Sequence, residues 1–321
     1  MTEHYVTLFD SVFLPQGLAL HHSLLEHGGD CLLWVLCLDQ ECFHALNKLQ
    51  LPQMCLLDLE QLETADLLAV KNDRSRAEYC WTLTPWSIQW VFESEPSAPR
   101  VTYVDADVFI LKNPSPIYDE FDASNCAVML TEHGYAPEYD QTPTSGRYCV
   151  QFLPFARGEG ERVLRWWRDR CLEWCYARFE NGLFGDQKYL ESFEHVFPGQ
   201  VHVARFNRYF QAPWNASIHP FSDAILYHFH GLRVVSWRLL FLVRYPIPAP
   251  TLEYVYRPYC QLLLGLPLQH GLNVSAQAAP PGRFQLFKRR LINAFRRNIL
   301  LQPLSVLWYQ SRADGAPGVL L

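Results

Sequence analysis

Two carboxylates one residue apart, Asp105 and Asp107, have the residue type and spacing needed to bind a divalent cation. They follow the apolar run VTYV at 101–104, which is typical of a strand buried on both faces of a parallel sheet. Burying an isolated carboxylate is costly, so such a pair needs an ion or a strand end that opens to solvent. Carboxylate oxygens suit Mn²⁺ or Mg²⁺, either of which can also contact a diphosphate. The pair therefore predicts a metal site at the carboxyl end of a strand.

An Asp-x-Asp by itself is a weak signal, because surface turns produce it often. The apolar run before it and the turn at 112–114 after it favour the ligand site. Phosphatases of the haloacid-dehalogenase type also carry Asp-x-Asp after a buried strand, but near the N-terminus and with Thr or Val two places on. Here Phe109 occupies that place and about a hundred residues precede the motif, so we disfavour this alternative.

Composition excludes several classes of protein. The chain has 321 residues, 49% of them hydrophobic, which is enough for one large α/β domain with appendages or for two small domains. The net charge of −6 argues against nucleic acid as the main partner. The ten cysteines lack Cys-x-x-Cys spacing, which points to a reducing cytoplasm and makes the sequons at Asn215 and Asn273 coincidental. No run reaches about eighteen apolar residues, so we expect no membrane-spanning helix.

The first part of the chain alternates strand and helix patterns. We expect strands at 5–9, 32–38, 54–59 and 101–104, and helices at 16–26, 41–49, 61–70 and 77–92. This alternation predicts an α/β fold with a mostly parallel central sheet and helices on both faces. Parallel strands share a direction, so Asp10 should lie at the same sheet edge as the Asp-x-Asp pair. Asp10 could meet a nucleotide base there, or simply cap a turn or helix.

The second half offers three further features. A strand pattern at 146–155 precedes an amphipathic helix at 161–179, whose tryptophans fit a core stripe better than sugar stacking. Asp186 and Gln187 stand at a helix start, where the acid could favour the helix dipole or the pair could hold sugar hydroxyls. His228 and His230 follow a strand pattern and are either structural or metal ligands.

The tail differs from the rest of the chain. Residues 283–300 contain six Lys or Arg residues and no acid, and apolar residues recur at helical spacing. A basic amphipathic helix of this kind suits an anionic membrane surface, although a packed terminal helix with a solvated basic face is the alternative. We expect a helical extension over 241–321, following a domain over 1–240.

Several ordered strings together carry a family resemblance. The chain resembles the nucleotide-diphospho-sugar glycosyltransferases of the A-type fold, close to family 8, and more narrowly uncharacterised bacterial members found among polysaccharide and lipopolysaccharide genes. The resemblance covers roughly residues 4–240. It rests on EYCWT (78–82), YVDAD (103–107), CLEWC (171–175), FGDQKYL (184–190), APWN (212–215) and YHFHG (227–231).

The resemblance implies a donor site and a metal site. Asp105 and Asp107 would hold Mn²⁺ against the diphosphate of a nucleotide sugar, expected to be UDP-linked. His228 matches the family's later metal ligand, since His228 and Gly231 parallel its His-x-x-Gly string. The 1–240 domain would then be a nucleotide-sugar-binding catalytic domain.

The resemblance also implies roles at the nucleotide base and the reaction centre. Asp10, with the backbone near Thr7 and Leu8, corresponds to the base contact, while Asp186 and Gln187 match the acid–amide pair at the sugar. Transfer would retain anomeric configuration, with a saccharide or lipid-linked glycan as acceptor. A lipid-linked acceptor would be met at the inner face of the cytoplasmic membrane.

This sequence departs from the family pattern at three places. Cys149 and Gln151 stand where Asn-x-Gly is expected. The predicted helix before the Asp-x-Asp strand lacks Arg or Lys over 82–91, so Arg74 or Arg76 would have to serve the donor. Arg233 is the nearest candidate for a missing lysine after Gly231.

Two alternatives to an active glycosyltransferase therefore stay open. One is a catalytically inactive, membrane-associated relative of the same fold. The other is a sugar nucleotidyltransferase, which would usually show a Gly-rich phosphate loop near the N-terminus; DSVFLPQG at 10–17 does not supply one.

Overall fold

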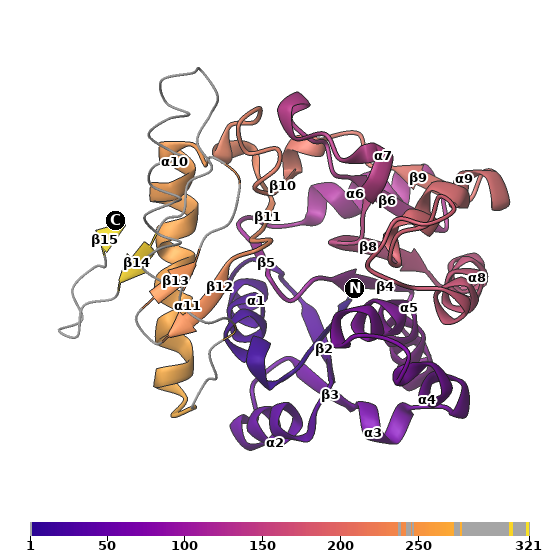
Figure 1. The fold of residues 1–321 in the computed structure, drawn as a ribbon, viewed down its shortest axis with the longest axis horizontal. Helices are drawn as coiled ribbons and strands as arrows, with labels where there is room; N and C mark the ends of the chain where they lie inside the picture. Colours follow the sequence, from indigo (N-terminus) through magenta and orange to yellow (C-terminus); the bar gives the residue numbers. More distant parts are fainter. Residues whose placement is uncertain are drawn as a thin grey trace.

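A central sheet of eight strands organises the computed structural model, which describes residues 2–236, 239–241, 245, 247–272, 277, 308–310 and 319–320. The strand order is β3-β2-β1-β4-β8-β6-β7, with β9 paired to β6 (Figure 1). The strands β1 to β4 run parallel, and β8 is antiparallel to β4. The bounds are β1 Glu3–Phe9, β2 Cys31–Cys37, β3 Met54–Asp58, β4 Arg100–Val104, β6 Val128–Glu132, β7 Tyr148–Cys149, β8 Phe152–Ala156 and β9 Val201–Val203.

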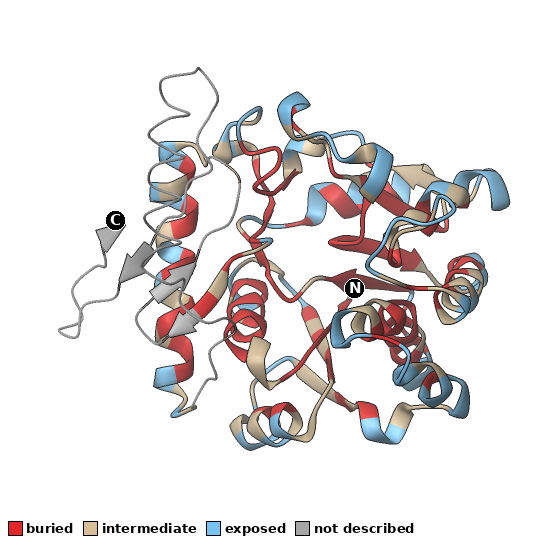
Figure 2. Cartoon of the chain, in the orientation of Figure 1, coloured by how far each residue is buried: buried red, intermediate tan, exposed pale blue. Residues whose placement is uncertain are grey.

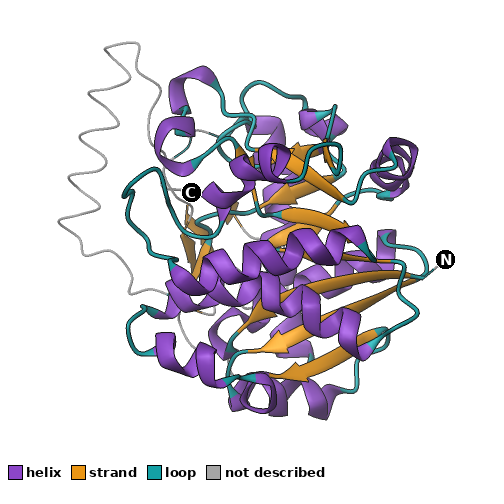
Figure 3. Cartoon of the chain, turned by 90° about the vertical axis from the view of Figure 1, so that its right-hand side faces the viewer, coloured by secondary structure: helices purple, strands orange, loops and turns teal. Residues whose placement is uncertain are grey.

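Helices cover both faces of this sheet, as the prediction of an α/β fold with a mostly parallel sheet required (Figure 3). Side chains alternate along β1, so that Tyr5 and Phe9 enter one core and Val6 and Leu8 the other. The helices are α1 Leu14–His27, α2 Gln40–Leu49, α3 Leu59–Leu62, α4 Ala65–Lys71, α5 Arg76–Ser94, α6 Ser115–Ser124, α7 Thr142–Ser145, α8 Glu159–Glu173, α9 Phe193–Val196, α10 Ala249–Thr251 and α11 Arg257–Gln269.

The two cores lie on opposite sides of the strands. One core contains residues of α1 and α11, and the other contains residues of α5 and α8. Figure 2 shows the buried strands between partly exposed helices. A pocket opens at the carboxyl ends of β1 and β4, and residues of α5 form part of its lining.

Three predicted elements differ from the structure. The helix expected at 61–70 is divided into α3 and α4, because Thr64 caps the second helix by accepting a hydrogen bond from the Leu67 amide at 3.4 Å. The strand expected at 146–155 is divided into β7 and β8. The helix expected at 161–179 ends at Glu173, and the chain turns back there so that Tyr189 Oη donates to the Trp174 carbonyl at 2.8 Å.

A second, three-stranded sheet connects distant parts of the sequence. It consists of β10 (Phe210–Gln211), β11 (Leu226–His228) and β5 (Val108–Ile110), with β11 antiparallel to β5. His228 is in register with Val108, and the Phe229 amide donates to the Asp107 carbonyl at 2.8 Å. This pairing brings a histidine from late in the chain to the Asp-x-Asp motif.

Among the C-terminal residues that the structure describes, 249–269 are helical, whereas 308–310 and 319–320 form short strands. A π-helical turn over Leu252–Tyr256 joins α10 to α11, and α11 packs along α1 (Figure 1). Buried residues of α11 belong to the same core as α1, so this part of the predicted 241–321 extension shares its core with the 1–240 region. A further antiparallel sheet contains β12 (Arg233–Ser236), β13 (Leu239–Phe241), β14 (Trp308–Gln310) and β15 (Val319–Leu320).

Two sequence-based expectations concern the membrane. The predicted basic amphipathic helix at 283–300 lies outside the described residues. Among the helices that the structure does describe, none combines the length and the apolar character needed to cross a bilayer.

Candidate metal centre and ligand pocket

A pocket of about 650 Å³ opens at the carboxyl ends of β1 and β4. This volume lies within the range of pockets that bind small molecules and cofactors. The pocket combines acidic, basic and aromatic side chains from both halves of the sequence. Its lining includes Leu8, Asp10, Arg76, Trp81, Thr84, Tyr103, Asp105, Asp107, His133, Tyr135, Cys149, Asp186, Gln187, Trp214, His228, His230 and Arg233.

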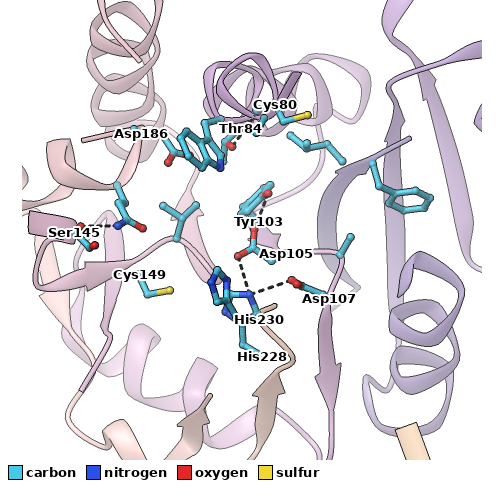
Figure 4. Close-up of a pocket in the computed structure, with 18 of the residues that line it drawn as sticks. Cys80, Thr84, Tyr103, Asp105, Asp107, Ser145, Cys149, Asp186, His228 and His230 are labelled. Atoms are coloured by element: carbon cyan, nitrogen blue, oxygen red, sulfur yellow. Dashed lines mark hydrogen bonds and ion pairs between the residues drawn. The ribbon is translucent and has the colours of Figure 1, made fainter. Parts of the chain in front are cut away.

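Asp105, Asp107 and His228 meet inside this pocket. The His228 Nε2 atom lies 3.0 Å from Asp107 Oδ1 and 3.6 Å from Asp105 Oδ2. The hydroxyl of Tyr103 donates to Asp105 Oδ1 at 3.0 Å, which fixes the orientation of that carboxylate (Figure 4). One ligand atom from each of the three residues lies within 4.8 Å of the other two. The residues predicted as metal ligands are thus brought together.

The charges of these three groups are strongly linked. Burial alone would raise the pKa of Asp107, but the His228 cation and its hydrogen bond outweigh burial and hold that pKa well below its usual range. Burial would likewise lower the pKa of His228, yet the Asp107 charge raises it well above 6.5. Burial raises the pKa of Asp105, an effect that His228 opposes. A proton on His228 Nε2 therefore occupies the place that a bound cation would take.

The donor set fits Mn²⁺ or Mg²⁺. Two carboxylates and one imidazole offer oxygen and nitrogen ligands on one side of the site, and the other side faces the open pocket. Carboxylate oxygens are the preferred ligands of these hard cations, and imidazole is compatible with Mn²⁺. The remaining coordination positions would be available to a ligand in the pocket.

Asp186 lies across the pocket from the triad (Figure 4), and Gln187, the next residue, also lines the pocket. The Asp186 carbonyl accepts a hydrogen bond from the indole of Trp167 at 2.9 Å, so a buried core residue fixes this turn. Gly185 precedes it at φ +53°, a conformation that favours glycine. Burial, together with the charge of Asp105, raises the pKa of the Asp186 carboxyl to about 8. The amide of Gln187 donates to the Ser145 carbonyl at 2.5 Å.

The predicted base-binding edge holds an ion-pair network. Asp10 Oδ1 accepts from the amides of Val12 and Phe13, as the capping alternative required, while Oδ2 lies 2.8 Å from Arg76. Arg76 also lies 2.9 Å from Asp39. Leu8 and Asp10 line the pocket, whereas Thr7 is buried within β1 and is not among the lining residues. Asp10 thus caps this turn and also lines the pocket.

The candidate cations are placed differently from one another. Arg76 and Arg233 line the pocket, and Arg233 Nη1 lies 3.8 Å from Asp107 Oδ2. Arg74 does not line it: its guanidinium is buried and donates to Thr82 Oγ1 and, at 2.6 Å, to the Leu172 carbonyl. The structure does not place Arg74 at the pocket, because its guanidinium is hydrogen-bonded to Thr82 of α5 and to Leu172 of α8.

Sequence reasoning missed an aromatic wall. The rings of His133 and Tyr135 stack with centroids 4.6 Å apart, and Trp214 meets His133 edge-on at 5.3 Å. The Trp214 indole donates to the His133 carbonyl at 2.7 Å. Trp214 belongs to the APWN string, but nothing in the sequence places it beside the loop at 133–135. The wall exists only because these loops meet in the fold.

By its fold and its site, this is an α/β protein with a carboxylate–histidine cluster in a pocket at the carboxyl edge of its sheet. No protein-family model matches the chain. The chain belongs to the same family as the uncharacterized protein YfnF of Bacillus subtilis (strain 168). The two are 34% identical over 256 residues, which cover 74% of this chain and 84% of YfnF.

Two solved structures of low sequence identity are also similar. Mouse xyloside xylosyltransferase 1 in its apo form aligns with a TM-score of 0.48 and 15% identity, covering 72% of this chain and 98% of its own. The apo form of the glycosyltransferase GlyE of Streptococcus pneumoniae TIGR4 aligns with a TM-score of 0.48 and 15% identity, covering 87% of this chain and 66% of its own.

Proposed function

We propose that this protein is a metal-dependent glycosyltransferase that moves a sugar from a nucleotide-diphospho-sugar to a saccharide or a lipid-linked glycan. The observation that carries the proposal is the Asp105–Asp107–His228 cluster at the end of β4, inside a pocket large enough for a nucleotide sugar. UDP is the expected nucleotide, and retention of anomeric configuration is the expected stereochemistry. Both follow from the family resemblance of the sequence strings.

The donor diphosphate would lie between the cluster and the pocket's cations. Asp105, Asp107 and His228 would hold Mn²⁺, which as a Lewis acid neutralises charge on the departing nucleotide diphosphate. Arg233 adds a fixed positive charge beside Asp107 and takes the place of the lysine that the family pattern expects. Arg76 supplies a second cation at the base-binding edge, where its pairing with Asp10 and Asp39 holds it in place.

The sugar would lie toward Asp186 and the aromatic wall. A carboxyl group with a pKa of about 8 is largely protonated at neutral pH, so Asp186 could donate a hydrogen bond to a sugar hydroxyl. Gln187 would orient the sugar beside it. Tyr135 and Trp214 line the pocket and would offer apolar surface to a pyranose ring. Unchanged turnover in Asp186→Ala, which removes the donor, would remove Asp186 from the reaction centre.

We also propose reversible attachment to an anionic membrane through residues 283–300. The support is compositional: six basic residues, no acid and apolar residues at helical spacing. Such attachment would bring the pocket to a glycan that grows on a lipid carrier at the inner face of the cytoplasmic membrane.

The deciding experiment is calorimetric titration with UDP, with and without Mn²⁺, on the wild type and Asp107→Ala. We expect binding to need both Mn²⁺ and Asp107, and turnover of Asp107→Ala with a UDP-sugar to fall on the order of 10²-fold or more. The exposed Asp73→Ala serves as a matched control and should behave as the wild type.

A negative outcome has a defined meaning. If UDP does not bind, the titration is repeated with GDP and with deoxythymidine and cytidine nucleotides. Failure of all four would contradict the glycosyltransferase proposal and favour a catalytically inactive relative of the fold. Wild-type turnover in Asp107→Ala with intact metal binding would contradict the role of Asp107 alone.

A further inference from the structure

Gln151 is a completely buried polar residue beside the metal centre, with 0% of its surface exposed. It follows β7 and stands directly before β8, the strand that pairs with the one leading to Asp105. The family that the sequence strings resemble would be expected to have glycine at this position. A buried amide side chain in place of glycine adds hydrogen-bonding groups next to the cluster.

The Gln151 side chain contacts one of the three candidate ligands. Its Oε1 atom lies 3.1 Å from Nδ1 of His228. An amide oxygen only accepts hydrogen bonds, so the Nδ1 atom carries the hydrogen and donates it. The other ring nitrogen, Nε2, then faces Asp107 at 3.0 Å and Asp105 at 3.6 Å. Gln151 thus selects which nitrogen of His228 is presented to the site.

The Gln151 backbone contacts a second candidate ligand. Its carbonyl accepts a hydrogen bond from the Asp105 amide at 3.2 Å. One residue therefore connects the start of the Asp-x-Asp turn to the imidazole that faces it. In the described part of the chain, Gln151 Nε2 has no hydrogen-bond partner. The side chain is therefore not explained by a hydrogen-bond network that satisfies both of its polar atoms.

We propose that Gln151 is a positioning residue that holds the His228 ring with Nε2 directed at a divalent cation shared with Asp105 and Asp107. The inference rests on the metal site of the proposed function. Histidine ligands in metal sites commonly donate their second ring N–H to a carboxylate or carbonyl oxygen, which fixes the tautomer and the ring orientation. Here a glutamine amide oxygen supplies that acceptor.

The test measures Mn²⁺ affinity in the full-length protein without nucleotide, by following the room-temperature EPR signal of free Mn²⁺. Gln151→Met keeps the side chain's length and removes the acceptor, so it should weaken Mn²⁺ binding by about 10- to 100-fold. Gln151→Glu restores an acceptor oxygen and should restore the affinity. If the methionine variant does not fold, Gln151→Asn replaces it, because shortening the chain by one methylene withdraws the acceptor from Nδ1.

The matched control is Gln211→Met. Gln211 is also 0% exposed, but its amide donates to the Arg208 and Pro220 carbonyls at 3.1 and 2.7 Å and it does not line the pocket. This control should lose thermal stability and keep wild-type Mn²⁺ affinity.

Each result has a distinct meaning. Wild-type affinity in Gln151→Met would overturn the positioning role while leaving the metal site intact. Weak binding in both Gln151→Met and Gln151→Glu would also overturn it, since packing rather than the acceptor would then explain the loss. A wild-type protein that binds no Mn²⁺ would overturn the metal site itself, and the role of Gln151 with it.

Discussion

At the scale of single residues, the pocket keeps neighbouring carboxyl groups in different charge states. Asp107 is paired with the His228 cation at 3.0 Å, so its pKa lies well below the usual range. Burial, together with the charge of Asp105, raises the pKa of Asp186 to about 8. Two acids with such different environments can serve different roles: one holds charge permanently and the other carries a proton at neutral pH.

The raised pKa of Asp186 predicts a pH dependence of stability. Its pKa is 3.8 in the unfolded chain and about 8 in the native protein, so the native state binds more protons between these values. The stabilising contribution is fully present below about pH 4 and is lost as the pH rises through about 8. Asp186→Asn stays neutral at every pH. In this variant the free energy of unfolding should therefore fall less steeply with rising pH than in the wild type.

This effect is measured by urea denaturation in the presence of a chelator, at several pH values from about 5 to about 8, where the two states differ in protonation of Asp186. Asp73→Asn, at an exposed position, should reproduce the wild-type profile. An Asp186→Asn profile parallel to that of the wild type would mean that the Asp186 carboxyl ionises normally in the native state.

At the scale of secondary-structure elements, strand pairing and helix packing assemble the site. The pairing of β11 with β5 places His228 opposite Val108, one residue from Asp107. The helix α11 packs on α1, which follows the turn that Asp10 caps. The rings of Phe229 and Tyr259 stack with centroids 3.6 Å apart and join α11 to the chain just after His228. The helical extension thus supports the segment that carries the candidate metal ligand His228.

Leu263→Ala tests whether α11 belongs to the same cooperative unit as the sheet. Leu263 is 1% exposed within the core that contains α1, so its truncation should lower the free energy of unfolding by about 2–5 kcal/mol in a single transition. Leu268→Ala is a matched control on the same helix, because Leu268 is 61% exposed and should change stability by less than about 0.5 kcal/mol. Equal effects of the two changes, or a separate early transition, would show that α11 is independent of the sheet.

At the scale of the whole molecule, charge is unevenly distributed along the sequence. The chain has a net charge of −6, yet residues 283–300 carry six positive charges and no acid. At about 1 kcal/mol per basic residue near an anionic surface, six residues would contribute at most roughly 6 kcal/mol. That is sufficient for reversible attachment, and added salt should weaken it.

Vesicle co-sedimentation of full-length variants tests this attachment. Replacing Arg289 and Arg290 by Gln should weaken binding to anionic vesicles by about 2 kcal/mol, or roughly 30-fold. Replacing the exposed Arg162 and Arg165 of α8 by Gln removes the same charge elsewhere and should leave binding unchanged. Truncation at Pro280 should abolish the salt-sensitive binding. Equal binding by the truncated protein would end the proposal.

The sequence by itself determined the α/β architecture and the edge at which the site lies. Apolar runs and helical periodicity are local signals, and they located β1 to β4, α1, α2 and α5 closely. Because parallel strands share a direction, the positions of Asp10 and Asp105 at one edge followed without further information. Spacing alone left open whether His228 is structural or a metal ligand, and the family resemblance of the ordered strings favoured the ligand.

Only the tertiary structure decided which side chains share the pocket. The sequence offers Arg74 and Arg76 equally as cations for the pocket. Hydrogen bonds to Thr82 and Leu172 hold the Arg74 side chain away from it, whereas Arg76 lies in the pocket beside Asp10. The contact of Gln151 with His228 joins residues 77 positions apart. Such contacts depend on how separate elements pack, and they leave no periodic trace in either segment. The local pattern could therefore locate the candidate metal site but not the residues that orient its side chains.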